Sequence, residues 1–322
     1  MVIFRLPDYK NFFLIEDSSG KETNFQFFPF LESDALNFSG NCKEISETEI
    51  RNLKIDSDSL PNLSNAIFEE KSNYLQNIQK AIELIKLNHL QKLVYSRRIK
   101  LEYKSVDAIE SFINLCNSYA NAFAYLLITN DECWIGAFSE LLGKYNHKTS
   151  EFTTMSLAGT LPISESWSNK EIQEHGAVSD FIFSTLKQYG TQVEKQPTVD
   201  HFSGAIKHLR NDFKATIDPT KVDSLIKALH PTPAVLGIPK ELCLKLIEKL
   251  ESNPREYYAG YSHVKMGDIS YYYVNLRCSK LFSSHAEIFV GGGITAQSKP
   301  EKEWTETILK SKAILDNLVY TP

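Results

Sequence analysis

The order of strand-like and helix-like segments constrains the fold of this chain more than any other feature. From Ser72, apolar residues recur every three or four positions through Tyr74, Ile78, Ile82 and Ile85, which predicts an amphipathic helix. Apolar segments that predict strands occupy residues 92–103, 123–129, 132–145, 204–217, 271–281 and 286–294. These segments lack the regular spacing of βαβ units, so an α+β fold is favoured over a parallel doubly wound sheet.

The first 66 residues are expected to form a smaller N-terminal portion that packs on a larger domain of residues 67–322. The aromatic segment 25–31 contains Pro29, which suits an edge strand or a bend. Residues 40–63 are polar and acidic, and they are predicted to be a connection. A chain of 322 residues can bury a large core, and single domains of this size exist.

Two helix starts are marked by capping signals. Ser168 followed by Glu171 resembles an N-cap with an acidic residue three positions later, so a helix is expected from there to about Leu186. A second helix is expected to begin after Pro300 and to reach about Leu318. Further helices are predicted at residues 220–229 and 239–251.

Composition argues against several classes of function. The net charge of −5 disfavours general nucleic-acid binding, which requires basic patches. No run of about 18 apolar residues is present, so no membrane span is expected, and the first residues do not resemble a signal peptide. The five cysteines are scattered and show no CxxC pairing, which indicates reduced thiols in a cytoplasmic protein rather than a disulfide framework or a zinc site.

Two pairs of glutamates suggest a metal site. Glu171 and Glu174 are three residues apart, as are Glu303 and Glu306, and on a helix this spacing places both carboxylates on one face. Either pair alone usually marks a solvated helix face. If the two pairs face each other, they offer oxygen ligands to a hard divalent cation such as Mg²⁺.

Eight segments in a fixed order carry a resemblance that covers residues 74–318. They are similar to the chorismate-utilising enzyme family, which comprises isochorismate, anthranilate, aminodeoxychorismate and salicylate synthases. The segments are KLVYSRR (92–98), GAFSELL (136–142), LAGT (157–160), KEIQEH (170–175), LHPTPAVLGIPK (229–240), REYYAGY (255–261), NLRCSKL (275–281) and VGGGITAQSKPEKEWTETILKSK (290–312). The resemblance implies a single large chorismate-binding catalytic domain of layered antiparallel sheets flanked by helices, with a shortened N-terminal portion.

Within this family, two positions favour an isochorismate synthase. Lys92 matches the lysine that acts as general base in isochorismate and salicylate synthases, where the ammonia-using anthranilate enzymes typically carry glutamine. Glu140 matches the general acid, although Phe138 and Ser139 depart from the usual G-A-[ST]-P-E-L-L pattern. The expected reaction adds water at carbon 2 of chorismate and removes the carbon 4 hydroxyl, for menaquinone or siderophore biosynthesis.

The resemblance also assigns the remaining site residues. Mg²⁺ is expected on Glu174 and Glu306, with Glu171 and Glu303 acting through bound water. Arg277 resembles the arginine that grips the pyruvyl carboxylate of the substrate, and a guanidinium matches that anion with two hydrogen bonds. Other residues expected to contact the substrate are Gly159, Thr160, His230, Tyr258, Gly292, Gly293 and Lys310, with His230 beside the ring.

Two alternatives remain open at this stage. A salicylate synthase would use the same base and acid and then eliminate pyruvate. A family member that binds chorismate without converting it is suggested by the altered GAFSELL loop and by Leu161, which stands where the family usually has arginine. Ala158 argues against the aminodeoxychorismate branch, which commonly has a lysine there. No glutaminase segment is evident, so no glutaminase subunit is expected, and the chain is expected to be a monomer.

Overall fold

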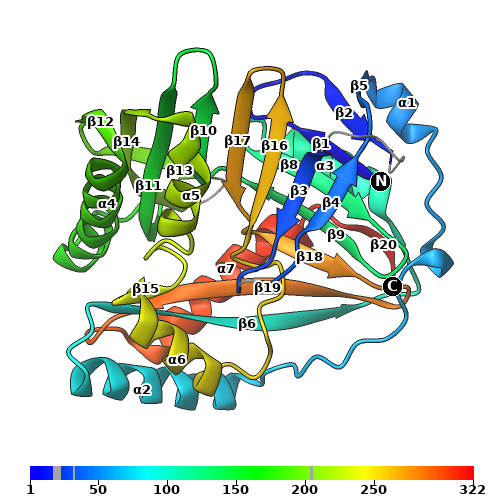
Figure 1. Cartoon of the computed structure of the whole chain (residues 1–322). Coiled ribbons are helices and arrows are strands. Elements are labelled where there is room, and N and C mark those ends of the chain that lie inside the picture. Colours follow the sequence, from blue (N-terminus) through cyan, green and yellow to red (C-terminus); the bar gives the residue numbers. More distant parts are fainter. Residues whose placement is uncertain (17–22, 32, 204–205) are drawn as a thin grey trace.

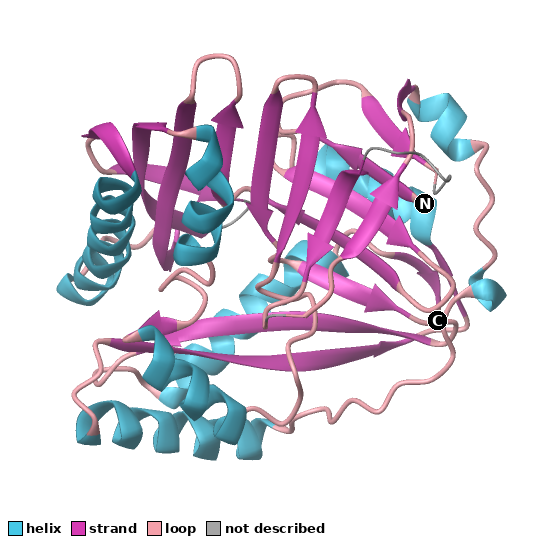
Figure 2. Ribbon diagram, in the orientation of Figure 1, coloured by secondary structure: helices cyan, strands magenta, loops and turns pink. Residues whose placement is uncertain are grey.

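The protein is built from two large antiparallel sheets with helices on the outside (Figures 1 and 2). The computed structural model describes residues 1–16, 23–31, 33–203 and 206–322. The first two residues of the strand predicted at 204–217 lie outside these ranges. The α+β fold of layered antiparallel sheets is confirmed.

The first sheet has nine strands and contains a long ladder between β6 and β19. In it, β6 pairs along nearly its whole length with β19, from Glu102 opposite His285 to Leu93 opposite Ile294. In spatial order the strands are β15 (Gly237–Ile238), β6 (Lys92–Glu102), β19 (His285–Ile294), β18 (Cys278–Leu281), β9 (Cys133–Phe138), β8 (Phe123–Ile128), β1 (Val2–Arg5), β2 (Phe12–Ile15) and β5 (Cys42–Ile45).

The second sheet also has nine strands. Eight of them follow one another in spatial order, and the ninth, β13 (Val199–Ser203), pairs with β14 beside this series. The series is β12 (Gly190–Lys195), β14 (Ile206–Ile217), β11 (Glu151–Pro162), β10 (Leu141–Asn146), β17 (Ile269–Val274), β16 (Tyr261–Met266), β3 (Thr23–Phe28) and β4 (Leu36–Ser39). A small separate pair is formed by β7 (Ser105–Asp107) and β20 (Val319–Thr321).

The helices cover the outer surfaces of the sheets, and α2 and α6 lie along β6 (Figure 1). They are α1 (Glu47–Arg51), α2 (Lys71–Leu87), α3 (Ala108–Ser118), α4 (Asn169–Tyr189), α5 (Val222–Leu229), α6 (Lys240–Leu250) and α7 (Pro300–Leu315), with short 3₁₀ turns η1 (Ser57–Ser59) and η2 (Pro219–Lys221). The predicted stripe from Tyr74 to Ile85 is the buried face of α2. Ser168 caps α4 through the predicted capping box with Glu171.

Aromatic side chains from both sheets fill the main core. Phe4 of the first sheet contacts Phe25 of the second with ring centroids 5.9 Å apart, and Phe27 of the second sheet lies 5.2 Å from Tyr125 of the first. All four rings are fully buried. Burial of such side chains is the dominant favourable term in folding, so this contact holds the two sheets face to face.

The N-terminal strands are part of both sheets. β1, β2 and β5 extend the first sheet, whereas β3 and β4 extend the second. The division proposed at residue 66 therefore separates segments whose strands pair with one another, and it stays a prediction. β3 ends at Phe28, directly before Pro29, and lies between β16 and β4 rather than at an edge. Residues 40–63, predicted to be a connection, contain β5, α1 and η1.

Two segments that the sequence predicts as single strands are each divided in two. Residues 132–145 form β9 and β10, and residues 271–281 form β17 and β18. At each break the chain passes from one large sheet to the other. In the described part of the chain, no helix combines the length and apolar character needed to cross a membrane.

Candidate active site

A cavity that opens to solvent lies where the two sheets meet. Its walls come from β6, β11 and β19, from α4 and α7, and from the breaks in the two divided segments. The predicted site residues that line it are Lys92, Glu140, Gly159, Thr160, Glu174, Tyr258, Arg277, Gly292, Gly293, Glu306 and Lys310. Segments far apart in the sequence therefore converge here as the resemblance implies.

The two breaks hold the acidic and basic residues predicted for catalysis and substrate binding. Glu140 lies between β9 and β10, and Arg277 lies between β17 and β18. The breaks are adjacent, because the amide of Val274 donates to the carbonyl of Glu140 at 3.0 Å and the amide of Ala137 donates to the carbonyl of Arg277 at 3.3 Å. Arg277 has a φ of 45°, a conformation that is uncommon for a non-glycine residue. Both side chains leave the strand pattern and line the cavity.

Glu140 has the properties of an acid that can donate a proton near neutral pH. Its side chain is buried, and burial raises the pKa of its carboxyl to about 7, against the opposing charges of Lys92 and Lys310. A carboxyl group with this pKa is substantially protonated near neutrality, which is the state that a general acid needs.

Lys92, at the start of β6, forms a buried ion pair with Glu174 of α4. The Nζ–Oε1 distance is 2.7 Å, and the two side chains are 3% and 11% exposed. Burial alone would raise the pKa of Glu174, but the charges of Lys92, Lys170 and Lys310 outweigh this effect and lower it. A Cβ atom at Gly293 would lie 2.5 Å from both Glu174 Oε1 and Lys92 Cε, so a side chain at this position would displace the pair.

Lys310 forms a second ion pair at the opposite side of the glycine-rich strand β19. Its ammonium lies 2.7 Å from Glu306, one turn earlier on α7, and donates to the carbonyl of Gly291 at 3.0 Å. Tyr258 packs on the same strand, because a Cβ at Gly291 would lie 2.8 Å from its hydroxyl oxygen. Lys92, Lys310 and Arg277 place three cationic groups on the cavity wall, and the first two are paired with Glu174 and Glu306.

His208 of β14 is a cavity residue that the sequence reasoning missed. Its Nε2 lies 3.1 Å from Nη2 of Arg277, and its Nδ1 lies 3.0 Å from the carbonyl oxygen of Gly159. Burial and the charge of Arg277 lower the pKa of His208 well below its ordinary value, so the ring is neutral. Nδ1–H therefore donates to Gly159 and Nε2 accepts from Arg277. No spacing in the sequence distinguishes this histidine from others on strands.

His230 is not among the residues that line this cavity, and its place beside the substrate ring stays a prediction. Its Nε2 is 3.3 Å from the carbonyl oxygen of Phe30, and its ring packs edge-on against Tyr261. It lines a separate cavity with these residues. The end of α5 carries His230 towards the N-terminal segment, and Ala234 and Val235 are the residues of this loop that line the main cavity.

Glu171 and Glu303 line a second cavity that shares Thr160, Glu306 and Lys310 with the first. The carboxylate of Glu171 is engaged in the capping box, where it accepts from the amide and hydroxyl of Ser168. Glu303 is 1% exposed and pairs with Lys170 at 3.1 Å. Burial and the neighbouring charge of Glu306 raise the pKa of Glu303.

The carboxylates fit a hard divalent cation only in combination with other oxygen ligands. Oε2 of Glu303 is buried, and Ser298 is the neutral hydrogen-bonding side chain near this carboxyl group. A Cβ at Gly292 would lie 3.7 Å from this Oε2 atom and from Oε1 of Glu306, so the glycine leaves space between β19 and the glutamates. No three acidic, histidine or cysteine side chains in the described ranges form a ready-made metal site. Mg²⁺ suits such a site, because it usually takes one or two carboxylates and completes its shell with water and substrate oxygens.

Comparisons with known proteins identify relatives over most of the chain. The family model described as "Chorismate binding enzyme" matches residues 31–319. Isochorismate synthase DhbC of Bacillus subtilis is 27% identical over 276 residues, which are 76% of this chain and 67% of that protein. Anthranilate synthase component 1 of Methanothermobacter thermautotrophicus is 25% identical over 94% of this chain and 70% of its own length.

The solved structure of MenF, the menaquinone-specific isochorismate synthase from Escherichia coli, superposes with a TM-score of 0.79. The superposition covers 98% of this chain and 88% of that chain at 19% sequence identity, which establishes the shared fold. In sequence, the chain spans 56–67% of the length of the first curated relatives that it matches.

Proposed function

The chain belongs to the family of chorismate-binding enzymes, and from this premise we propose that it is an isochorismate synthase that depends on Mg²⁺. The observation that carries the proposal is the presence of Lys92 and of Glu140, with its raised pKa, in one cavity. Lysine at position 92, rather than the glutamine of the ammonia-using branch, favours water as the nucleophile. The relatives that are named isochorismate synthases support the same choice.

Chorismate carries two carboxylates, and the cavity offers cationic and backbone groups to bind them. Arg277 is proposed to bind the pyruvyl carboxylate through its guanidinium group, held by His208. Lys310 and the backbone amides of the strand at Gly292 and Gly293 are proposed to lie near the ring carboxylate. Tyr258, Gly159 and Thr160 complete the wall around the substrate.

In the proposed reaction, Lys92 acts as a neutral amine, after losing the proton that it carries in the ion pair with Glu174. The amine removes a proton from a water molecule that attacks carbon 2 of the ring. Glu140 donates a proton to the carbon 4 hydroxyl, which leaves as water, so one water enters and one leaves. Lys92 then releases its extra proton to solvent, and Glu140 takes up a proton from solvent, which restores both side chains for the next turnover. Glu174 and Glu306 would hold Mg²⁺, with Glu171 and Glu303 contacting it through water, and the ion would supply positive charge for the ring carboxylate.

The test is incubation of the purified protein with chorismate, with and without Mg²⁺, followed by chromatography and mass spectrometry of the products. We expect a new isomer of equal mass that forms only with Mg²⁺. Salicylate and pyruvate would instead identify a salicylate synthase. Absence of any product would favour a protein that only binds chorismate.

A K92A variant provides the matching control. It should lose hydroxyl transfer because no base remains at carbon 2, while chorismate binding through Arg277 and Lys310 is retained. A K92A variant that forms the isomer at the wild-type rate would show that another group is the base.

A further inference from the structure

Three lysines and three glutamates form pairs around the glycine-rich strand. Lys92 pairs with Glu174 at 2.7 Å, Lys310 pairs with Glu306 at 2.7 Å, and Lys170 pairs with Glu303 at 3.1 Å. The first two pairs involve residues already assigned to catalysis, substrate binding and metal binding. Lys170 has no such role, and its pairing with a buried glutamate therefore needs an explanation of its own.

The positive charge of Lys170 is unfavourable at its position in α4 unless its ion pair with Glu303 compensates for it. Lys170 occupies the first turn of α4, where the helix dipole favours negative rather than positive charge. The side chain of Lys170 is 28% exposed and reaches Glu303 on α7. The side chain of Glu303 is 2% exposed. The contact joins the two helices that carry the proposed metal ligands, and both residues line the second cavity.

Charge balance explains what the contact does. In the absence of a divalent cation, each of these three carboxylates is offset by the ammonium group with which it is paired. Without Lys170, Glu303 would be an unpaired buried charge beside Glu306, which is costly. A divalent cation that approaches Glu303 meets the ammonium of Lys170 already in place, and like charges within a few ångströms repel strongly away from bulk water.

We propose that Lys170 is a built-in counter-cation that competes with Mg²⁺ for Glu303 and so weakens binding of the ion in the absence of substrate. Oε1 of Glu303 contacts Lys170, whereas Oε2 faces the space beside Gly292 and is the atom through which Mg²⁺ or its water would enter. The chorismate dianion would then offset the two charges that Mg²⁺ adds, so ion and substrate bind together. The identity of the ion rests on the proposed function, whereas the competition at Glu303 does not depend on which chorismate reaction follows.

The experiment measures Mg²⁺ binding without chorismate by titration calorimetry, and Mn²⁺ binding by electron paramagnetic resonance. K170Q removes the charge but keeps a polar side chain, and it should bind either ion at least about tenfold more tightly than the wild type. K302Q is the matched control, because Lys302 lines the same cavity, is exposed and forms no ion pair in the described chain. K302Q should change the affinity by less than about twofold. K170R keeps the charge and should behave as the wild type.

Thermal unfolding provides a readout that is independent of turnover. Without metal, K170Q should unfold at a lower temperature than the wild type, because Glu303 loses its partner, and Mg²⁺ should raise its melting temperature by more. Equal or weaker ion binding by K170Q, equal effects of K170Q and K302Q, or no ion binding by any variant would each overturn the proposal. The product assay with wild-type protein is scored separately, so a failure of the proposed reaction remains distinguishable.

Discussion

At the scale of single residues, two carboxyl groups that line the cavity have pKa values shifted in opposite directions by their surroundings. Glu140 is buried and its pKa is raised to about 7, whereas the charges of nearby lysines lower the pKa of the equally enclosed Glu174. The difference arises because Glu174 is in contact with the ammonium of Lys92 and Glu140 is not paired with a cation in this way. Such a separation between two carboxyl groups is typical of acid and base assignments in active sites.

The raised pKa of Glu140 predicts a specific dependence of stability on pH. The folded protein binds the Glu140 proton up to about pH 7, whereas the unfolded chain releases it near pH 4.5. Between these values the folded state holds more protons, so this group's contribution to stability falls as pH rises. E140Q removes the contribution. Relative to E140Q, the wild type should lose on the order of 3 kcal/mol of unfolding free energy between pH 4.5 and 7.5.

Denaturant unfolding of both proteins across that pH range is the measurement. The comparison with E140Q cancels every other titrating group, because the two chains differ at one side chain only. Parallel curves for the two proteins would show that Glu140 ionises at an ordinary pH and is not suited to act as an acid near neutrality.

The neutral ring of His208 predicts a second residue-scale effect. It accepts a hydrogen bond from Arg277 and donates one to Gly159, and Arg277 has a backbone conformation that needs support. Glutamine can supply one acceptor and one donor in a similar arrangement, whereas alanine supplies neither. H208A should raise the Michaelis constant for chorismate about tenfold or more, as expected when a charged hydrogen bond is lost.

The H208Q variant tests whether His208 acts by holding the guanidinium group of Arg277 in place. It should retain a Michaelis constant close to that of the wild type, while both variants keep cooperative thermal unfolding. If alanine and glutamine weaken binding equally, the histidine does more than orient Arg277, and a direct contact with substrate becomes the better explanation.

At the scale of elements, helices α2, α4, α5, α6 and α7 and the strands within six apolar segments could be predicted from the sequence. Helices α1 and α3, strand β11 and the breaks in two predicted strands could not. The apolar run 132–145 continues through Ser139 and Glu140, and the run 271–281 continues through Asn275 and Arg277. Both interruptions are caused by passage of the chain between the two sheets, which is a long-range feature without a local pattern. Because the breaks place Glu140 and Arg277 in the cavity, the resemblance predicted these residues while strand periodicity did not.

His208 and His230 also show that the sequence alone does not identify which histidines line the cavity. His230 belongs to a family-like segment and was expected in the site, yet the end of α5 directs it to Phe30. His208 belongs to none of the quoted segments, yet the pairing of β14 with β11 brings it to Gly159. Neighbouring strands are determined by the whole fold, so no inspection of one segment could assign either histidine.

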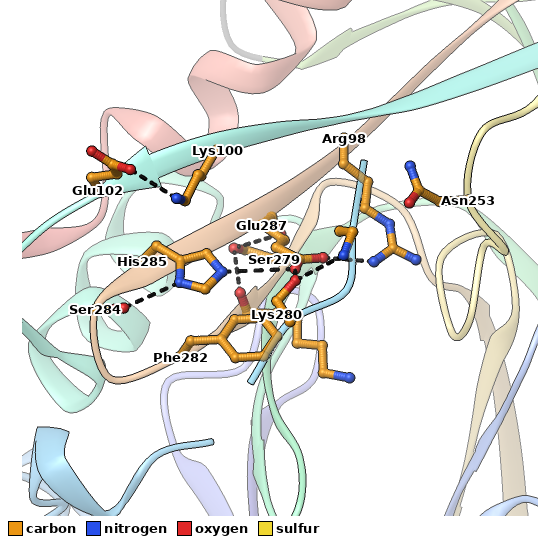
Figure 3. A network of polar contacts seen from close by, with 12 residues as sticks. Arg98, Lys100, Glu102, Asn253, Ser279, Lys280, Phe282, Ser284, His285 and Glu287 are labelled. Carbon is orange, nitrogen blue, oxygen red and sulfur yellow. Dashed lines mark hydrogen bonds and ion pairs between the residues drawn. The ribbon is translucent and has the colours of Figure 1, made fainter. Parts of the chain in front are cut away.

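A second element-scale feature is the segment of residues 61–67, here termed the strap, which connects η1 to α2. The amide of Ser283 donates to the carbonyl of Pro61, and Asn253 exchanges two hydrogen bonds with the backbone of Ile67. The hydroxyl of Ser64 donates to Glu287. Figure 3 shows Glu287 between Arg98 and His285, and Arg98 donates to it at 2.6 Å. The strap is thus tied to a buried ion pair.

Removal of Glu287 should destabilise the fold because Arg98 would be left without its most buried partner. The pair is 7% and 1% exposed, and breaking such a pair from one side costs roughly 3–5 kcal/mol. We expect E287A to lower the free energy of unfolding by about this amount, measured in urea. E287Q keeps the acceptor for Ser64 and should cost less.

The control is E102A, on a pair that lies in the same view of Figure 3 but is exposed to solvent. Lys100 and Glu102 are 37% and 76% exposed, and surface pairs of this kind contribute little. E102A should leave the unfolding curve essentially unchanged. Similar losses in E287A and E102A would mean that burial of the Arg98 pair is not what stabilises this region.

At the scale of the whole molecule, the question is whether residues 67–322 form a domain of their own. β1 lies between β8 and β2, and β3 lies between β16 and β4. Removing the first 66 residues would therefore expose the edges of β8 and β16. It would also take Phe4, Phe25 and Phe27 from the core between the sheets, at roughly 1.5–3 kcal/mol for each side chain. Typical domains are stable by only about 5–15 kcal/mol in total.

We therefore expect the fragment 67–322 to lack cooperative thermal unfolding and to be digested rapidly by protease, although the site residues all lie within it. Removal of residues 319–322 at the other end is the matched control, because β20 is exposed and pairs with β7 outside the two large sheets. That shorter chain should unfold cooperatively near the temperature of the full-length protein. A fragment 67–322 that folds and binds chorismate would establish the boundary at residue 66, and the N-terminal strands would then be an addition to a self-sufficient catalytic domain.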